Sequence, residues 1–139
     1  MSTQRFFTPA EVDALIPKLA GLVETMMERH REASDLAAAL RAEQERIRAA
    51  GGGRIDQRDW QARAERLDGL GIEVRVSIEA IGELGGAVKD LAMGLVDFPG
   101  RVHGVKGGEP VNLCWKHGET GVRFWHGFDE GYAHRKPLP

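Results

Sequence analysis

The chain has 139 residues, enough for one domain with a substantial core but not for two independent cores. Its formal net charge is −2, with 19 basic residues spread among 21 acids, which argues against binding to nucleic acid or to an acidic membrane surface. Cys114 is the only cysteine, so an internal disulfide is excluded, and no segment approaches the about 20 apolar residues of a membrane span. We therefore expect a soluble cytoplasmic protein.

The first helix is expected to begin just after Thr8. Thr8 can act as the N-cap, Pro9 suits the first helical position, and Glu11 can bond back to the Thr8 amide. Pro17 lacks the amide hydrogen that a helix needs, and its ring clashes with the preceding turn. We therefore expect a kink or break near residues 15–16, which separates a short N-terminal helix from a longer one.

Two seams of mostly apolar residues predict two long helices. From Leu19 to Ile47 the seam positions are spaced alternately four and three residues apart, as on one stripe of a helix. A second seam with the same spacing runs from Trp60 to Ile81. The glycines at 51–53 form a turn between them, and Asp56 can cap the second helix. These features predict an antiparallel helical hairpin over residues 8–84.

Pairing the two seams outward from the glycine turn makes further predictions. Ala37 lies opposite Gly71, where two small residues would allow the helices to cross closely. His30 lies on the seam, which is typical of a core histidine, but it approaches Asp90 if the open end of the hairpin packs on the sheet. Because several apolar residues lie off the seams, either the C-terminal segment or a second copy of the chain has to cover them, and we predict a homodimer with a bundle of four helices. These residues are Leu22, Met27, Leu70, Ile72 and Val76.

Residues 85–139 change to the alternation that is typical of strands. Two glycines at 85–86 end the second helix, and within residues 111–116 every second side chain is apolar. Pro99 is expected to end a strand, and the prolines at 137 and 139 argue against a regular C-terminal element. We expect strands at 95–98, 111–116 and 122–126. The predicted architecture is a single α+β domain over residues 1–139, a long antiparallel helical hairpin followed by a small antiparallel β-meander.

Several motifs together resemble a known family. They are FFTPAEVDALIP at 6–17, VKDL at 88–91, GLVDFP at 94–99, LCW at 113–115, WH at 125–126 and GYAHRKPL at 131–138. Their combination resembles an uncharacterised bacterial family, domain of unknown function 2203. The resemblance implies a common fold over most of the chain but no established activity.

The resemblance also marks individual positions. The positions that match the family's pattern are Lys89, Asp90, Asp97, Cys114, Trp115, Trp125 and His126. His103, His117 and His134 depart from that pattern, which argues against a site built from these three. Of the matching residues, Lys89, Asp90, Asp97, Trp115, Trp125 and His126 are candidates for ligand binding.

Two metal sites can be drawn from the polar residues of the C-terminal part. Cys114 and His117, completed by His126 and His134, have the residue types of a zinc site, whereas a lone cysteine in an apolar strand is more often a small packed residue. Asp90, Asp97 and His126 could instead hold a divalent metal or act as an acid–base pair at the junction of helices and sheet. If a divalent metal is bound, Asp90, Asp97 and His126 are therefore its candidate ligands.

Each candidate also has a purely structural interpretation. The two aspartates could bind loop amides, and His126 could hydrogen-bond an aspartate to fix the sheet. Trp115 and Trp125 could stack on a flat ligand or close a small core. No phosphate-binding loop and no serine nucleophile motif is present.

Three functional hypotheses of different classes follow, and the choice between the first two leaves open whether the protein is an enzyme. The first is a non-enzymatic interaction or assembly module that forms a dimer, or binds a protein partner, through the hairpin. The second is a small metal- or ligand-binding protein, or an enzyme, that uses the carboxylate and imidazole site. A nucleic-acid binder is disfavoured by the balanced charge.

Overall fold

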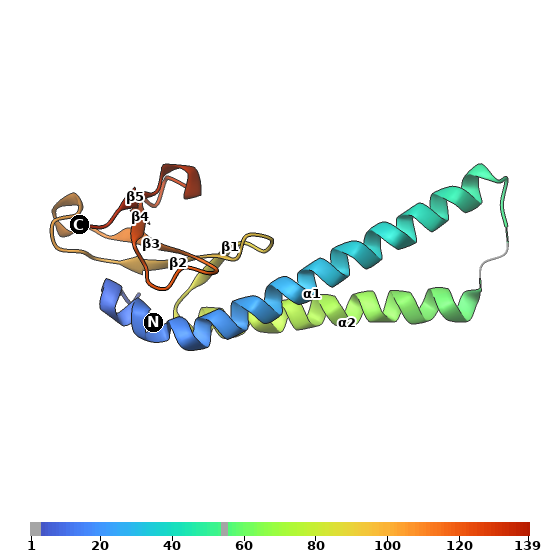
Figure 1. The fold of residues 1–139 in the computed structure, drawn as a ribbon, viewed down its shortest axis with the longest axis horizontal. Helices are drawn as coiled ribbons and strands as arrows, with labels where there is room; N and C mark the ends of the chain where they lie inside the picture. Colours follow the sequence, from blue (N-terminus) through green and yellow to red (C-terminus); the bar gives the residue numbers. More distant parts are fainter. Residues whose placement is uncertain (1–3, 54–55) are drawn as a thin grey trace.

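The computed structural model describes residues 4–53 and 56–139. Two long helices, α1 (Pro9–Ala49) and α2 (Gln57–Leu84), form an antiparallel hairpin that is followed by a five-stranded antiparallel sheet. Figure 1 shows the sheet at one end of the hairpin, with the helices moving apart toward the connecting loop at the other end. The predicted α+β architecture is confirmed. No described helix is long and apolar enough to cross a membrane.

Helix α1 begins as predicted but does not break at Pro17. Thr8 accepts a hydrogen bond from the amide of Glu11, and the Glu11 carboxylate accepts one from the Thr8 amide. The helix then continues through Pro17, so the predicted separation into two helices is wrong. Pro17 and Asp13 both lie on the exposed side, where water can bind the carbonyl that loses its partner. Burial of Val12 on the other side holds the helix against the core.

The two helices pair in the predicted antiparallel sense. Arg66 of α2 binds Glu32 of α1 at 2.8 Å, and Arg63 forms an ion pair with Glu43. The close crossing that we predicted at Gly71 is wrong, because a Cβ atom added to this exposed residue would meet no atom within 4 Å. The helices therefore do not need glycine at this position for their packing.

The sheet contains two more strands than the sequence predicted. Pro99, which was expected to end a strand, and Pro137, which was expected to argue against one, both lie within strands. Pro99 lies beyond the last residue that pairs with the preceding strand, so that strand does not need the amide hydrogen that Pro99 lacks. Pro137 lies in the edge strand of the sheet. The strands, in spatial as in chain order, are β1 (Ala87–Asp90), β2 (Leu95–Gly100), β3 (Val111–Lys116), β4 (Phe124–His126) and β5 (Lys136–Pro137).

The two faces of the sheet differ in chemistry because successive side chains alternate between them. One face is apolar and packs against both helices, forming a common core. The opposite face carries the polar residues of the central strands, and neither α1 nor α2 packs against it. The core joins Val12, Leu19, Val23 and Met26 of α1 and Val74 and Ile81 of α2 to Val96, Phe98, Leu113 and Trp115 of the sheet.

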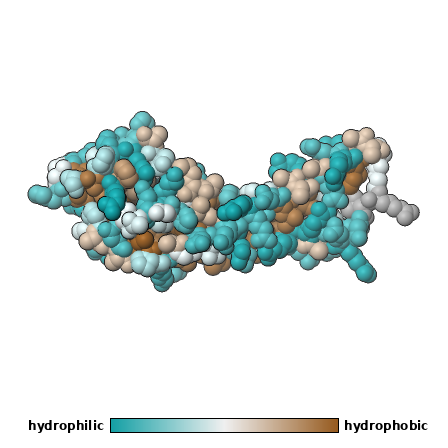
Figure 2. Space-filling view, in the orientation of Figure 1, coloured by the Kyte–Doolittle hydropathy of each residue, from teal (hydrophilic) through white to brown (hydrophobic). Residues whose placement is uncertain are grey.

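Only part of the hairpin contributes to this core. The buried residues of α1 lie mostly between Val12 and Met26, and toward the connecting loop only Leu40 is buried. On the face shown in Figure 2, the hydrophobic surface along the hairpin is divided into small patches between polar residues. Of the apolar residues expected to need a cover, Leu70 is buried and Leu22 and Met27 pack against the core, but Ile72 and Val76 are exposed.

Candidate metal centre

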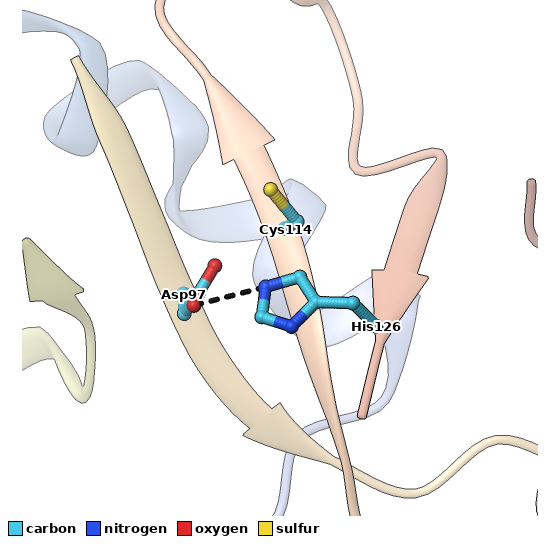
Figure 3. A group of neighbouring side chains, drawn as sticks. All are labelled: Asp97, Cys114 and His126. Atoms are coloured by element: carbon cyan, nitrogen blue, oxygen red, sulfur yellow. Dashed lines mark ion pairs between the residues drawn. The ribbon is translucent and has the colours of Figure 1, made fainter. Parts of the chain in front are cut away.

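Three neighbouring strands each place one chemically active side chain on the polar face of the sheet. Asp97 comes from β2, Cys114 from β3 and His126 from β4 (Figure 3). Asp97 and Cys114 are direct cross-strand partners, whereas His126 is paired with Asn112 and lies diagonally across from Cys114. All three side chains are buried. The register of the sheet therefore brings together a carboxylate, a thiol and an imidazole.

Two contacts fix the orientation of the His126 ring. Its Nδ1 atom lies 2.9 Å from the carbonyl oxygen of Gly127, and its Nε2 atom lies 3.0 Å from Oδ2 of Asp97. A carbonyl oxygen can only accept a hydrogen bond, so Nδ1 carries a proton and donates it. The Nε2 atom is thereby directed toward Asp97 and Cys114. It can share a proton with the Asp97 carboxylate or offer its lone pair to a cation.

The spacing of the three side chains suits a metal ion. One ligand atom from each lies within 4.8 Å of the others. A tetrahedral zinc ion with bonds of about 2.0–2.3 Å places its ligand atoms roughly 3.3–3.8 Å apart, so a small side-chain adjustment would bring the three atoms into coordination. The hydrogen bond from Nδ1 to a backbone carbonyl is the kind of outer contact that orients metal-binding histidines.

The surroundings of Cys114 argue against a free nucleophilic thiolate. Burial, with a smaller contribution from the negative charge of Asp97, raises the pKa of the Cys114 thiol to about 11. The thiol therefore stays protonated near neutral pH unless a cation binds to it. A bound metal ion would deprotonate it, because a thiol that coordinates a metal gives up its proton.

The cluster forms the floor of a cavity with a volume of about 430 Å³. A shallower groove shares four residues with the cavity and extends to Gly82 near the end of α2. Our prediction that the site lies at the helix–sheet junction needs correction, because the cavity is on the sheet face away from the helices and only the groove reaches α2. The cavity is lined by Lys89, Asp90, Met93, Leu95, Asp97, Asn112, Cys114, His126, Phe128, Glu130, Gly131 and Tyr132.

Two other predicted site residues line the cavity without joining the cluster. The Asp90 carboxylate accepts a hydrogen bond of 2.7 Å from the Met93 amide, the structural role that we considered for it. A bulge between Val88 and Asp90 shifts the register of β1 at this point. Lys89 lines both the cavity and the groove.

The two tryptophans lie on the other face of the sheet. Trp115 is buried in the core and donates from Nε1 to the carbonyl of Glu119 at 2.9 Å. Trp125 packs against the same core, with Nζ of Lys136 4.7 Å from its ring centre. Their positions agree with the core role that we weighed against ligand stacking, because neither lines the cavity.

The four-ligand zinc site drawn from the sequence does not form. Within residues 4–53 and 56–139, the metal-compatible cluster contains Cys114 and His126 but neither His117 nor His134. Our prediction from the sequence did not combine Cys114 with Asp97. The alternation of β3 could have suggested it, because Cys114 lies two residues from the polar Asn112 and therefore faces away from the core. His30 does approach the turn after β1, where it lines a small cavity with Ala92.

The family of the chain follows from comparison with known proteins. The model of a family described as uncharacterised conserved proteins, DUF2203, matches residues 5–138. The chain belongs to the DUF2203 family. Comparisons with curated proteins and with solved structures found no match. All three residues of the cluster fall within the DUF2203 match, and the family's description names no activity, so functional inference for this DUF2203 protein rests on the geometry of its site.

Proposed function

We propose that this DUF2203 protein binds one divalent transition-metal ion, of the zinc type, through Asp97, Cys114 and His126. The observation that carries this proposal is the convergence of the three buried side chains at one point, with His126 Nδ1 held by Gly127 and Nε2 turned toward the other two. Imidazole and thiolate ligands favour zinc and similar ions over magnesium or calcium.

The number of protein ligands favours a metal site that binds or acts on a ligand over a purely structural metal site. Structural zinc sites use four protein ligands, whereas sites that act on a substrate use three and keep one position open. Here three ligands lie at the floor of a cavity of about 430 Å³, so the open position would face a space that a small molecule can enter. When bound there, the ion would polarise a water molecule or a ligand oxygen.

Metal content measured after reconstitution with zinc tests the proposal. We expect about one zinc ion per wild-type chain, and zinc affinity at least about tenfold weaker in Asp97→Asn, Cys114→Ser and His126→Ala, because each change removes a ligand. His117→Ala is the matched control, since His117 follows the same strand as Cys114 but lies outside the cluster. Circular dichroism establishes that each variant is folded. Wild-type zinc affinity in all three folded variants would contradict the proposal.

A second candidate function is assembly through the hairpin. It is favoured by Ile72 and Val76, which are one helical turn apart on α2 and 55% and 58% exposed. A homodimer, or a complex with a protein partner, would cover them. Sedimentation at about 50 µM, where weak dimers are still populated, is expected to give a dimer for the wild type and a monomer for Ile72→Lys. A monomeric wild type would contradict self-association.

The single buried thiol supports a cytoplasmic location for either function.

A further inference from the structure

The polar groups that line the cavity differ in whether they are already engaged. The Asp90 carboxylate binds the Met93 amide, and Glu130 accepts hydrogen bonds from Lys136 and from the Gly127 amide. Among the described residues, Lys89 takes part in none of the ion pairs. Asp90 and Glu130 thus each have a hydrogen-bond partner, whereas Lys89 has no ion-pair partner among the described residues.

Other donors lie around the same space. Asn112 on β3 contributes a side-chain amide, and Tyr132 contributes a phenolic hydroxyl. Asn112 is the cross-strand partner of His126, so its side chain lies on the same face of the sheet as the cluster. A ligand in the cavity would therefore meet hydrogen-bond donors above the metal site, which is the environment that favours oxygen atoms with negative charge.

The remainder of the cavity wall is apolar. Met93 and Leu95 line it, together with Phe128, whose side chain is 55% exposed. Phe128 lines the adjoining groove as well, so it stands where the two spaces meet. An exposed aromatic ring beside a polar cluster offers a contact surface to the apolar part of a ligand.

We propose that the ligand is a small organic anion with an apolar group, such as an aromatic carboxylate. The inference rests on the proposed metal site. One carboxylate oxygen takes the open position on the metal, the other binds Lys89, and the apolar group lies against Phe128. A zinc ion with the Asp97 carboxylate, the Cys114 thiolate and a neutral His126 has no net charge, so Lys89 supplies the positive charge that selects an anion. A cavity of about 430 Å³ is large enough for such a molecule.

Cobalt-loaded protein allows binding of the ligand to be measured separately from binding of the metal. Cobalt content and the thiolate-to-cobalt absorption band are measured first, and benzoate and acetate are then titrated while the cobalt spectrum is followed. We expect benzoate to bind more tightly than acetate, and Lys89→Met to weaken both by about tenfold, the effect of losing one charged hydrogen bond. Phe128→Ala should weaken benzoate alone. Lys18→Met, an exposed lysine on α1, is the matched control.

The possible results distinguish this inference from the proposed function. Full cobalt content and the thiolate band in every variant, with anion binding reduced only by Lys89→Met and Phe128→Ala, would support it. Full cobalt content with a spectrum that neither anion changes, or with equal binding by Lys89→Met and wild type, would overturn the anion inference alone. Failure of the wild type to bind cobalt or zinc would overturn the proposed metal site and the inference together.

Discussion

Gly100 in the sheet and the two glycines Gly69 and Gly71 in α2 have opposite relations to their surroundings. A Cβ atom on Gly100 of β2 would lie 2.6 Å from Leu113 Cδ1 and equally close to the carbonyl oxygen of Phe7. On Gly69 and Gly71 of α2 an added Cβ would meet nothing within 4 Å. Close packing around β2 thus requires glycine at position 100, whereas the packing of α2 does not require glycine at positions 69 and 71.

This difference follows the division of roles between the two regions. The sheet holds three buried polar side chains in a fixed arrangement, which requires exact strand register and tight packing underneath. The part of the hairpin near the connecting loop buries few residues and carries no cluster of this kind among the described residues. The following predictions test how strongly stability is concentrated at the sheet end.

The largest expected effect comes from the core beneath the site. Phe98→Ala removes a fully buried ring that packs edge-on against Phe7 with ring centres 5.3 Å apart. We expect a loss of about 3–5 kcal/mol in the free energy of unfolding, measured by urea denaturation. Ile47→Ala, at a half-buried position near the connecting loop, is the control and should cost about 1 kcal/mol or less. Equal losses would mean that stability is not concentrated at the sheet.

Gly100→Ala should have the next largest effect. Its Cβ would collide with a backbone oxygen, which cannot move as a flexible side chain can. We expect a loss of about 2–3 kcal/mol in unfolding free energy, because overpacking forces the strand or the segment at Phe7 to shift. A thermal unfolding curve that matches the wild type would show that the contact between β2 and Phe7 is looser than the structure indicates.

Gly71→Ala should act in the opposite direction and more weakly. Alanine has the higher helix propensity and meets no neighbouring atom here, so we expect a gain of about 0.5–1 kcal/mol in unfolding free energy. Gly52→Ala serves as the matched control, because Gly52 has a φ of 99° and alanine would be strained there. Destabilisation by Gly71→Ala would reveal a contact at this position, for example with a second copy of the chain.

The smallest expected effect concerns Glu130, which lines the cavity. A hydrogen bond from Lys136, followed by one from the Gly127 amide, lowers the pKa of Glu130 to about 2. Its contribution to stability is therefore complete above the unfolded-state pKa of about 4.3 and is lost as pH falls toward 2. Comparison of urea unfolding at pH 5 and pH 2.5 should show a smaller acid-induced loss in Glu130→Gln than in the wild type. Identical acid-induced losses in the two proteins would show that ionised Glu130 does not contribute to stability.

Much of the fold could be predicted because local patterns agree with the tertiary structure. The capping box at Thr8, the seams and the alternation in β3 each have a local signal. Pro17 misled the prediction because burial of neighbouring residues outweighs one lost hydrogen bond. The strands β1 and β5 are too short for a periodic pattern, with four and two residues. They form because neighbouring strands offer them partners.

The candidate site was only partly predictable for a similar reason. Asp97 and His126 were expected together, but Cys114 joins them through the register of three strands, which one sequence does not specify. Asp90 was expected in the cluster, yet the bulge in β1 and the bond to the Met93 amide direct it elsewhere. The residue types indicated a site on these strands, and the register decided its members.

X-ray absorption spectroscopy at the zinc edge, on wild-type protein reconstituted with one equivalent of zinc, tests the central claim most directly. The arrangement of Asp97, Cys114 and His126 predicts one sulfur neighbour at about 2.3 Å and two or three nitrogen or oxygen neighbours at about 2.0–2.2 Å. The sulfur neighbour should disappear in Cys114→Ser. A zinc environment without sulfur, or with two or more sulfur neighbours, would contradict a centre built from these three side chains.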